Sequence, residues 1–193
     1  MKPVIVLGAG GHARVLIDAL RLRSVKILGV ADPAADKASL KKMGLKVVGG
    51  DDGVLKYPPS KIQLVNGVGS VRVSGKRAAI FSRFKKKGYV FATVVHPTAI
   101  VASGVELGEG AQIMAGVILQ TGVKIGKNTI VNTRVSVDHD CVIGAHAHLA
   151  PGVVLSGDVR VGDGSHLGTG AVVTQGADIG AGTFVRANSL VHA

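Results

Sequence analysis

The sequence predicts a small Rossmann-like α/β domain at residues 1–95, followed by a left-handed parallel β-helix at residues 96–193. Three observations predict this fold class. An apolar strand runs into a glycine-rich turn near the N-terminus, and an aliphatic residue recurs at every sixth position through the second half. Aromatic residues make up only 3% of the chain, against 28 glycines. A core with so few rings indicates thin, repeated layers of aliphatic side chains.

The first domain begins with a strand, a glycine turn and a helix. Val4–Leu7 is a short apolar run of the buried-strand type, and apolar residues at helical spacing follow over 15–20. Between them lies Gly8–Arg14, and the N–H groups at such a helix start are a natural phosphate cradle. The alternative is that these glycines only make a tight turn.

Further apolar runs at 27–30, 46–48 and 62–65, with an amphipathic helix near 75–87, complete a predicted parallel sheet. The second strand ends near Asp32, a place where an acid often receives a ribose hydroxyl. The dinucleotide-binding motif Gly-x-Gly-x-x-Gly is incomplete, because Ala13 stands where the last glycine would be. The domain is also short, which suits a mononucleotide better than a dinucleotide. An NAD-dependent dehydrogenase therefore ranks last.

The second half repeats every six residues. Sixteen positions from Val101 to Val191, six apart and without insertion, are all Val, Leu or Ile. A second series from Val105 is small or β-branched and includes Cys141, which we expect to be a packed thiol. A third series from Gly104 is mostly Gly or Asn, which tolerate the positive φ of a corner. A short strand plus a turn fits this period, and three units would close a triangular coil.

The net charge of +11 lies in the first half. Residues 1–95 hold 18 Lys and Arg against 5 Asp and Glu, whereas residues 96–193 hold 5 against 7. A basic half fits a phosphorylated small molecule, an acidic lipid or a nucleic acid. Rings for base stacking are scarce and no nucleic-acid motif stands out, so we expect no nucleic-acid partner.

The sequence also bears on location. No apolar run has the roughly 18 residues that a membrane span needs, so we expect none. The single cysteine, Cys141, excludes an internal disulfide, which favours a reducing compartment and a cytoplasmic location.

Four of the seven histidines cluster in the repeats: His139, His146, His148 and His166. A metal site is the first interpretation of such a cluster. However, His146 and His148 occupy different repeat positions, while His148 and His166 are one coil apart and stack on one edge. We therefore expect surface imidazoles and no metal.

The chain resembles the family of sialic-acid O-acetyltransferases and bacillosamine/perosamine N-acetyltransferases of bacterial surface-sugar biosynthesis. The resemblance rests on Gly8–His12, Val65–Ser70, His96–Ala99 and Asn132–Cys141, in the family's order. It implies that the first domain binds a nucleotide-linked amino sugar. It also implies that the β-helix forms a homotrimer and binds acetyl-CoA between subunits.

Acetyl transfer to an amine needs a general base and a donor for the developing oxyanion. His139 is flanked by Asp138 and Asp140, either of which can orient its ring; the alternative is an incidental surface histidine. Gly157 lies one coil further along the same edge, where the lack of a side chain would let a thioester approach the backbone N–H.

The resemblance assigns roles to ten residues. The catalytic set is His139 as general base, Asp140 as its acidic partner and Asn132 as a polar neighbour. The acetyl-CoA set is His148 near the thiol, Gly157 near the acetyl carbonyl and Thr169 along the pantetheine. The substrate set is Gly10, Gly11 and His12 at the phosphates, with Asp32 near the nucleoside.

The predicted activity is acetyl-CoA-dependent N-acetylation of a nucleotide-linked amino (dideoxy) sugar. The alternatives are O-acetylation of a sialic-acid-like sugar and a non-catalytic sugar-nucleotide-binding or scaffold protein. Sequence leaves the nucleotide open among UDP, GDP and CMP. Family members carry a Gly-x-Pro-Ala-Lys/Arg segment after the last coil, and this sequence stops at Ser189–Ala193, so we expect weaker CoA binding.

Overall fold

The computed structural model describes residues 2–70, 73 and 75–193, which fall into two compact units. The first unit holds the described residues of 1–69 and 76–92, and the second holds those of 70–75 and 93–193. The described residues of 70–75, although they lie within the sequence range of the first unit, therefore belong with the second.

The first unit is built around a four-stranded parallel sheet with strand order β3-β2-β1-β4. Its elements are β1 (Val4–Leu7), α1 (Gly11–Leu22), β2 (Ile27–Ala31), α2 (Lys37–Lys42), β3 (Val47–Gly49), α3 (Asp51–Leu55), β4 (Gln63–Asn66) and α4 (Lys76–Lys86). Because β1 pairs with both β2 and β4, the strand order reverses beside β1. Open α/β sheets bind ligands at such a point. The predicted Rossmann-like domain is confirmed.

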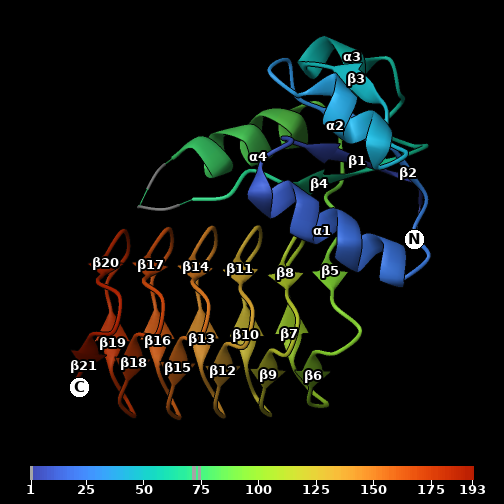
Figure 1. Cartoon of the computed structure of the whole chain (residues 1–193). Coiled ribbons are helices and arrows are strands. Elements are labelled where there is room, and N and C mark those ends of the chain that lie inside the picture. Colours follow the sequence, from blue (N-terminus) through green and yellow to red (C-terminus); the bar gives the residue numbers. More distant parts are fainter. Residues whose placement is uncertain (1, 71–72, 74) are drawn as a thin grey trace. The chain divides into compact units, whose positions relative to one another are not determined.

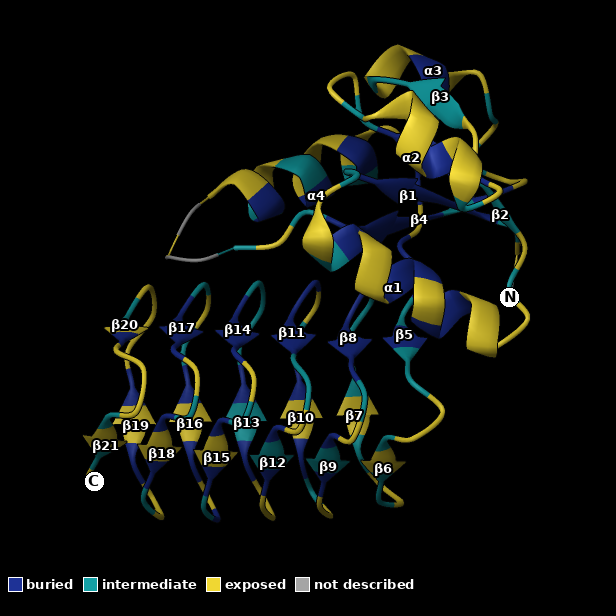
Figure 2. Cartoon of the chain, in the orientation of Figure 1, coloured by how far each residue is buried: buried dark blue, intermediate teal, exposed yellow. Residues whose placement is uncertain are grey.

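Helix α1 shows why the sequence pattern located it. Its buried residues are Ala13, Leu16, Ile17, Ala19 and Leu20. They recur at helical spacing and form one buried side, while the other side is exposed (Figure 2). The N-cap, Gly10, offers no side-chain hydrogen bond to the helix start.

Helices α2 and α3 were not predicted. α2 has one buried residue, Leu40, and so carries no apolar stripe. It begins instead at Asp36, whose carboxylate accepts the N–H groups of Ala38 and Ser39. α3 spans only five residues, too few for a helical period to show in the sequence.

The second unit is a left-handed parallel β-helix, as predicted. Its two-residue strands are β5 (Val94–Val95), β6 (Ile100–Val101), β7 (Glu106–Leu107), β8 (Gln112–Ile113), β9 (Ile118–Leu119), β10 (Lys124–Ile125), β11 (Ile130–Val131), β12 (Ser136–Val137), β13 (Val142–Ile143), β14 (His148–Leu149), β15 (Val154–Leu155), β16 (Arg160–Val161), β17 (His166–Leu167), β18 (Val172–Val173), β19 (Asp178–Ile179), β20 (Phe184–Val185) and β21 (Leu190–Val191). Each strand pairs in parallel with the strand three places further along the chain, for example β5 with β8. The coils therefore stack along one axis (Figure 1).

The coils make three sheets. Sheet I contains β5, β8, β11, β14, β17 and β20; sheet II contains β6, β9, β12, β15, β18 and β21; sheet III contains β7, β10, β13, β16 and β19. The predicted inward series is confirmed, because its members from Ile113 to Val185 are buried in one core. Val101, Leu107 and Val191 are only partly buried, since terminal coils have a neighbour on one side.

The corners take the left-handed backbone conformation that the Gly/Asn series predicted, for example at Gly116, with φ of +67°, and Asn128, with φ of +54°. Four residues that are neither Gly nor Asn do the same, with φ between 55° and 60°: Arg134, Asp140, His146 and Asp158. The stacking of the coils imposes this φ wherever the sequence lacks glycine.

Candidate active site

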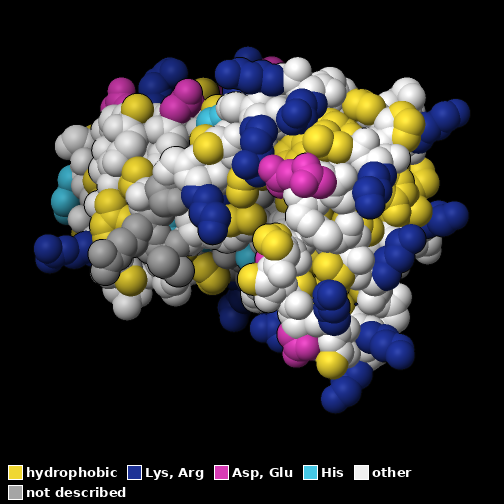
Figure 3. All heavy atoms as spheres, turned by 90° about the horizontal axis from the view of Figure 1, so that it is seen from above, with side chains coloured by type: hydrophobic (Ala, Val, Ile, Leu, Met, Phe, Trp, Pro, Cys, Tyr) yellow, Lys and Arg dark blue, Asp and Glu magenta, His cyan; other side chains and the backbone are white. Residues whose placement is uncertain are grey.

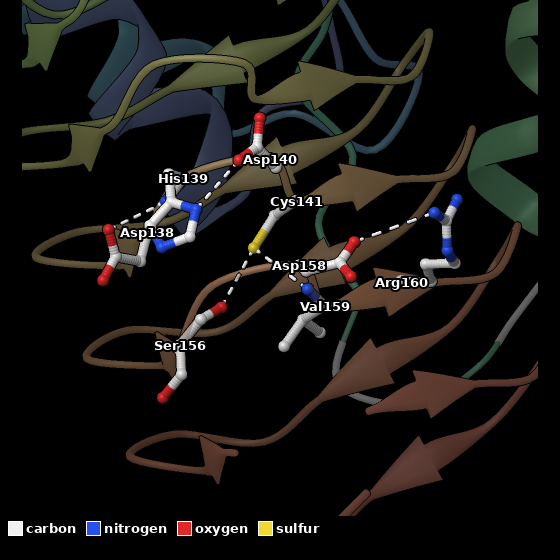
Figure 4. Close-up of polar contacts among 8 residues, drawn as sticks. All are labelled: Asp138, His139, Asp140, Cys141, Ser156, Asp158, Val159 and Arg160. Atoms are coloured by element: carbon white, nitrogen blue, oxygen red, sulfur yellow. Dashed lines mark hydrogen bonds and ion pairs between the residues drawn. The ribbon is translucent and has the colours of Figure 1, made fainter. Parts of the chain in front are cut away.

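His139 and Asp140 form a hydrogen-bonded pair at the corner between β12 and β13 (Figure 4). His139 Nδ1 lies 2.9 Å from Asp140 Oδ2, and 48% of the histidine side chain is exposed. Asp138 accepts the backbone N–H of His139 at 2.8 Å. Because the carboxylate holds the Nδ1 proton, the ring lone pair lies on Nε2, as a general base requires.

The surrounding acids raise the pKa of His139. The hydrogen bond to Asp140 is the largest cause; partial desolvation opposes it, and the charges of Asp138 and Asp158 add to it. The ring is therefore a stronger base than an ordinary histidine.

Two glycines bracket the pair, one coil away on either side. A Cβ on Gly157 would lie 2.6 Å from both Cε1 and Nε2 of His139, and a Cβ on Gly122 would overlap Asp140 Oδ1. Gly157 does not have the left-handed φ that demands glycine, so space for the imidazole explains it. The sequence interpretation left this space for a thioester, whereas here the His139 ring fills it.

The buried thiol of Cys141 lies beside this corner and plays a packing role. Its Sγ donates to the Ser156 carbonyl at 3.1 Å and accepts the Val159 N–H at 3.4 Å (Figure 4). Burial raises the pKa of the Cys141 thiol. The interpretation as a packed thiol agrees with these contacts.

A second group of predicted residues meets elsewhere on the β-helix. His148 lies on β14 of sheet I, and Asn132 opens the next corner, between β11 and β12. Asn132 Nδ2 is 3.2 Å from His148 Nε2, and Ser70 Oγ is 3.0 Å from His148 Nδ1. Ser70 was not predicted as a site residue, because it lies 78 residues before His148, outside the repeats, and carries no periodic signal.

Three rings form a ladder on sheet I. The His148 and His166 centroids are 4.7 Å apart, edge to face, and His166 stacks on Phe184 at 5.4 Å. They line a pocket of about 340 Å³ that also includes Ser70 and Thr169. Burial lowers the pKa of His166. The expected stack of His148 and His166 is present, although both rings are buried rather than at the surface.

The two groups do not meet within one chain. His139 and His148 are nine residues apart, which is half of an 18-residue coil, and so they lie on different sides of the β-helix. His139, Asp140 and Gly157 occupy the corner between sheets II and III, whereas Asn132 and Thr169 occupy the corner between sheets I and II. Sheet II separates the two groups.

The outward face of sheet II is apolar. Its exposed residues include Ile100, Val154, Val172 and Leu190, each at least 39% exposed. The outward positions of sheet III are mostly charged instead, as in the 2.9 Å ion pair of Lys124 with Glu106. Exposed apolar faces of this kind are typical of surfaces that bind another protein.

In the first unit, a pocket of about 520 Å³ opens where the strands of the sheet end. Its charged lining comprises the carboxylates Asp32 and Asp51 and the cations Lys76 and Arg83, and Arg83 is ion-paired with Asp51 at 2.8 Å. Asp32 Oδ2 accepts the Ala9 N–H and Oδ1 accepts the Ala34 N–H, both at 2.9 Å. The carboxylate therefore fixes the loops after β1 and β2, a role that the sequence interpretation did not include.

Gly10, Gly11 and His12 lie at the start of α1 and are not among the residues lining this pocket. A Cβ on Gly10 or Gly11 would meet no atom within 4 Å, so the backbone there is open to approach. His12 packs beside Gly69, where an added Cβ would lie 3.1 Å from the His12 Cβ.

Among the described residues, no group of three or more His, Cys, Asp or Glu side chains is arranged to hold a metal ion. His146 Nδ1 lies 2.9 Å from Asn128 Nδ2, at a corner apart from the ladder. None of the helices in the described part of the chain is both long and apolar enough to span a membrane. Lys and Arg side chains are spread over the face shown in Figure 3 rather than gathered in one patch.

Comparison with known proteins gives three matches to family models. Residues 3–84 match the PglD N-terminal domain, and residues 122–157 match the bacterial transferase hexapeptide (six repeats). Residues 98–121 and 158–192 match the hexapeptide repeat of succinyl-transferase. No curated protein matches the chain in sequence.

Solved structures match almost the whole chain. PerB from Caulobacter crescentus, in complex with CoA and GDP-perosamine, is 35% identical with a TM-score of 0.88, over 98% of this chain and 88% of that one. The acetyltransferase domain of PglB from Neisseria gonorrhoeae FA1090 is 27% identical with a TM-score of 0.88, over 99% and 91%.

Proposed function

Because this chain belongs to the family of hexapeptide-repeat sugar acetyltransferases with a PglD-type N-terminal domain, and is an acyltransferase, we propose that it N-acetylates a nucleotide-linked amino sugar with acetyl-CoA. The observation that carries the proposal is the His139–Asp140 pair, held with Nε2 of the imidazole as the basic atom. PerB was solved with CoA and GDP-perosamine, and the PglB domain with acetyl coenzyme A, which supports both substrate classes.

His139 would act first as base and then as acid. Its Nε2 takes a proton from the sugar amine as the nitrogen attacks the thioester carbonyl, and Asp140 stabilises the imidazolium that forms. The Gly157 N–H, which donates no hydrogen bond to another described residue, would bind the developing oxyanion. When the C–S bond breaks, the imidazolium returns its proton to the thiolate of CoA. The products are an N-acetyl sugar and free CoA.

We propose that the complete site forms between subunits of a homotrimer. Sheet II carries the apolar face, and its two edges carry the two separate groups of predicted residues. In a head-to-tail ring, one edge of each subunit meets the other edge of the next. His139 of one copy would then face Asn132, His148 and Thr169 of its neighbour.

The pocket of the first unit is the proposed nucleotide site. It opens where the strand order reverses, and a diphosphate bound there would be contacted by Lys76 and by Arg83, the latter in exchange for its ion pair with Asp51. Gly10, Gly11 and His12 lie at the start of α1, just after the lining residue Gly8, and their backbone N–H groups would contact phosphates that extend out of the pocket. Asp32 would reach the nucleoside with the lone pairs that its two loop contacts leave unused.

The test is release of the free CoA thiol from acetyl-CoA with UDP-, GDP- and CMP-linked amino sugars and with a CMP-linked sugar that offers only hydroxyl groups. Wild type, His139→Ala and the exposed-histidine control His192→Ala are compared. We expect release with one nucleotide class that is lost only in His139→Ala. Release only with a CMP-linked hydroxyl acceptor would favour O-acetylation, and no release or CoA binding would favour a scaffold. Release that survives His139→Ala would remove His139 as the base.

A further inference from the structure

The imidazole of His148 is held at both nitrogens by protein side chains. Its Nδ1 lies 3.0 Å from Ser70 Oγ, and its Nε2 lies 3.2 Å from Asn132 Nδ2. The residue is only 7% exposed, so these contacts decide which form the ring adopts. Ser70 belongs to the same compact unit as His148, although 78 residues separate them in sequence.

The orientation of the Asn132 amide is fixed independently of the histidine. Asn132 Oδ1 accepts the Thr133 backbone N–H at 2.8 Å, and an N–H can only be accepted by the amide oxygen. The amide nitrogen therefore faces His148 Nε2. Since that nitrogen is a donor only, Nε2 must be the acceptor and carries no proton.

It follows that the proton of His148 lies on Nδ1, which donates to Ser70 Oγ. A second proton on Nε2 would set two donors against each other at 3.2 Å. His148 is thus neutral as well as fixed.

We propose that Ser70 is a positioning residue of the acyl-transfer site, which holds His148 as the neutral Nδ1–H form. This inference rests on the proposed function, in which His148 contacts the acetyl-CoA thiol region. A neutral ring there neither gives a proton to the departing thiolate nor repels a cationic amine. Proton transfer is left to His139, whose ring is hydrogen-bonded to Asp140.

The first test needs no substrate. ¹⁵N-histidine-labelled protein is studied by ¹⁵N–¹H correlation of the imidazoles, with the His148 signals assigned by their loss in His148→Gln. We expect a protonated Nδ1 and a bare Nε2 at neutral pH in the wild type. A protonated Nε2, or a doubly protonated ring, would overturn the proposal even if the enzyme acetylates sugars as expected.

The second test compares Ser70→Ala, Ser70→Thr and the exposed control Ser60→Ala. Ser70→Ala removes one neutral hydrogen bond. We expect kcat/KM for acetyl-CoA to fall about 3- to 10-fold, which is the factor that corresponds to the free energy of one such bond. The Nε2–H form should appear in its spectrum, and Ser70→Thr should restore both readouts. An unchanged spectrum and rate in Ser70→Ala would remove the role of Ser70. If the wild type is inactive but shows the expected spectrum, the proposed function and the role of Ser70 in acyl transfer are both overturned. The hydrogen bonding of His148 would then still stand.

Discussion

Replacing Gly157 by alanine tests the His139 geometry directly. The new Cβ would lie 2.6 Å from Cε1 and Nε2 of the ring and 3.2 Å from Cδ2. Carbon atoms in contact normally lie about 3.5–4.0 Å apart, so the ring must move by about 1 Å. The backbone at Gly157 accepts alanine without a left-handed penalty, so the structural effect within the chain falls on the side chain of His139.

The structural cost of this change is small and the functional cost large. Nearly half of the His139 side chain is exposed, so the ring can swing outward, at the cost of its 2.9 Å bond to Asp140. That bond lies at an exposed corner, where solvent screens it, so its loss should change the Tm little. A misplacement of about 1 Å at a catalytic group can reduce the rate about 100-fold. We expect kcat to fall by about that factor.

The assay is CoA-thiol release at saturating substrates, with thermal unfolding of the same samples. Gly180→Ala is the matched control, because its Cβ would meet only Thr183 Oγ1 at 3.8 Å, an ordinary contact on a different corner. It should keep the wild-type kcat. A Gly157→Ala enzyme with wild-type kcat would refute the reasoning, since the ring would then not need the space above Gly157.

Three further predictions follow from single contacts. Asp140→Asn removes the largest cause of the raised His139 pKa, so the acid limb of the pH–kcat/KM profile should move to lower pH, while kcat falls about 10-fold or more. Asp32→Ala removes two loop contacts, and it should lower Tm by about 4–8 °C, from about 2 kcal/mol, and raise KM for the sugar nucleotide. Native Cys141 should resist a thiol reagent at pH 8 and react once the chain is unfolded, because the thiol is buried and its pKa is raised.

Each of these predictions has its own control. Asp158→Asn should move the acid limb in the same direction but less, and an unmoved limb in Asp140→Asn would contradict the assigned cause. Asp178→Ala, an exposed carboxylate on sheet III, should leave Tm within about 1 °C of wild type, and an equal loss there would remove the loop role of Asp32. Rapid labelling of native Cys141 would show that its coil opens readily.

The β-helix was predictable in detail because each residue's environment recurs with a fixed period. One aliphatic position per six residues identified the core, and the Gly/Asn series identified the corners. The corner at Asp140 was not part of the Gly/Asn series. Its left-handed backbone is imposed by stacking against Gly122 and the next coil, which the residue type does not reveal. In the first unit the apolar strands and α1 were predicted from the sequence. Helices α2 and α3 were not, because neither has apolar residues repeated at helical spacing.

The site was predictable only in part, for a related reason. His139 and Asp140 are adjacent in sequence, so their hydrogen bond follows from local chemistry. The contact of Ser70 with His148 joins residues 78 apart, and no period links them. The loop contacts of Asp32 likewise depend on how two strands end side by side. The homotrimer, the cytoplasmic location and the substrate contacts stay predictions.

The period of the coil also decides how the site can be assembled. His139 and His148 lie half a coil apart, and no side-chain movement carries one across a filled aliphatic core to the other. If both serve one reaction, they come from different copies. Inactive His139→Ala and His148→Ala chains, mixed before assembly, should therefore regain activity, because some interfaces join an intact His139 to an intact His148. Random mixing in a ring gives about one competent interface in four, so about a quarter of the wild-type rate is expected. A mixture as inactive as its parents, despite verified subunit exchange, would mean that one chain does not complete the site of another.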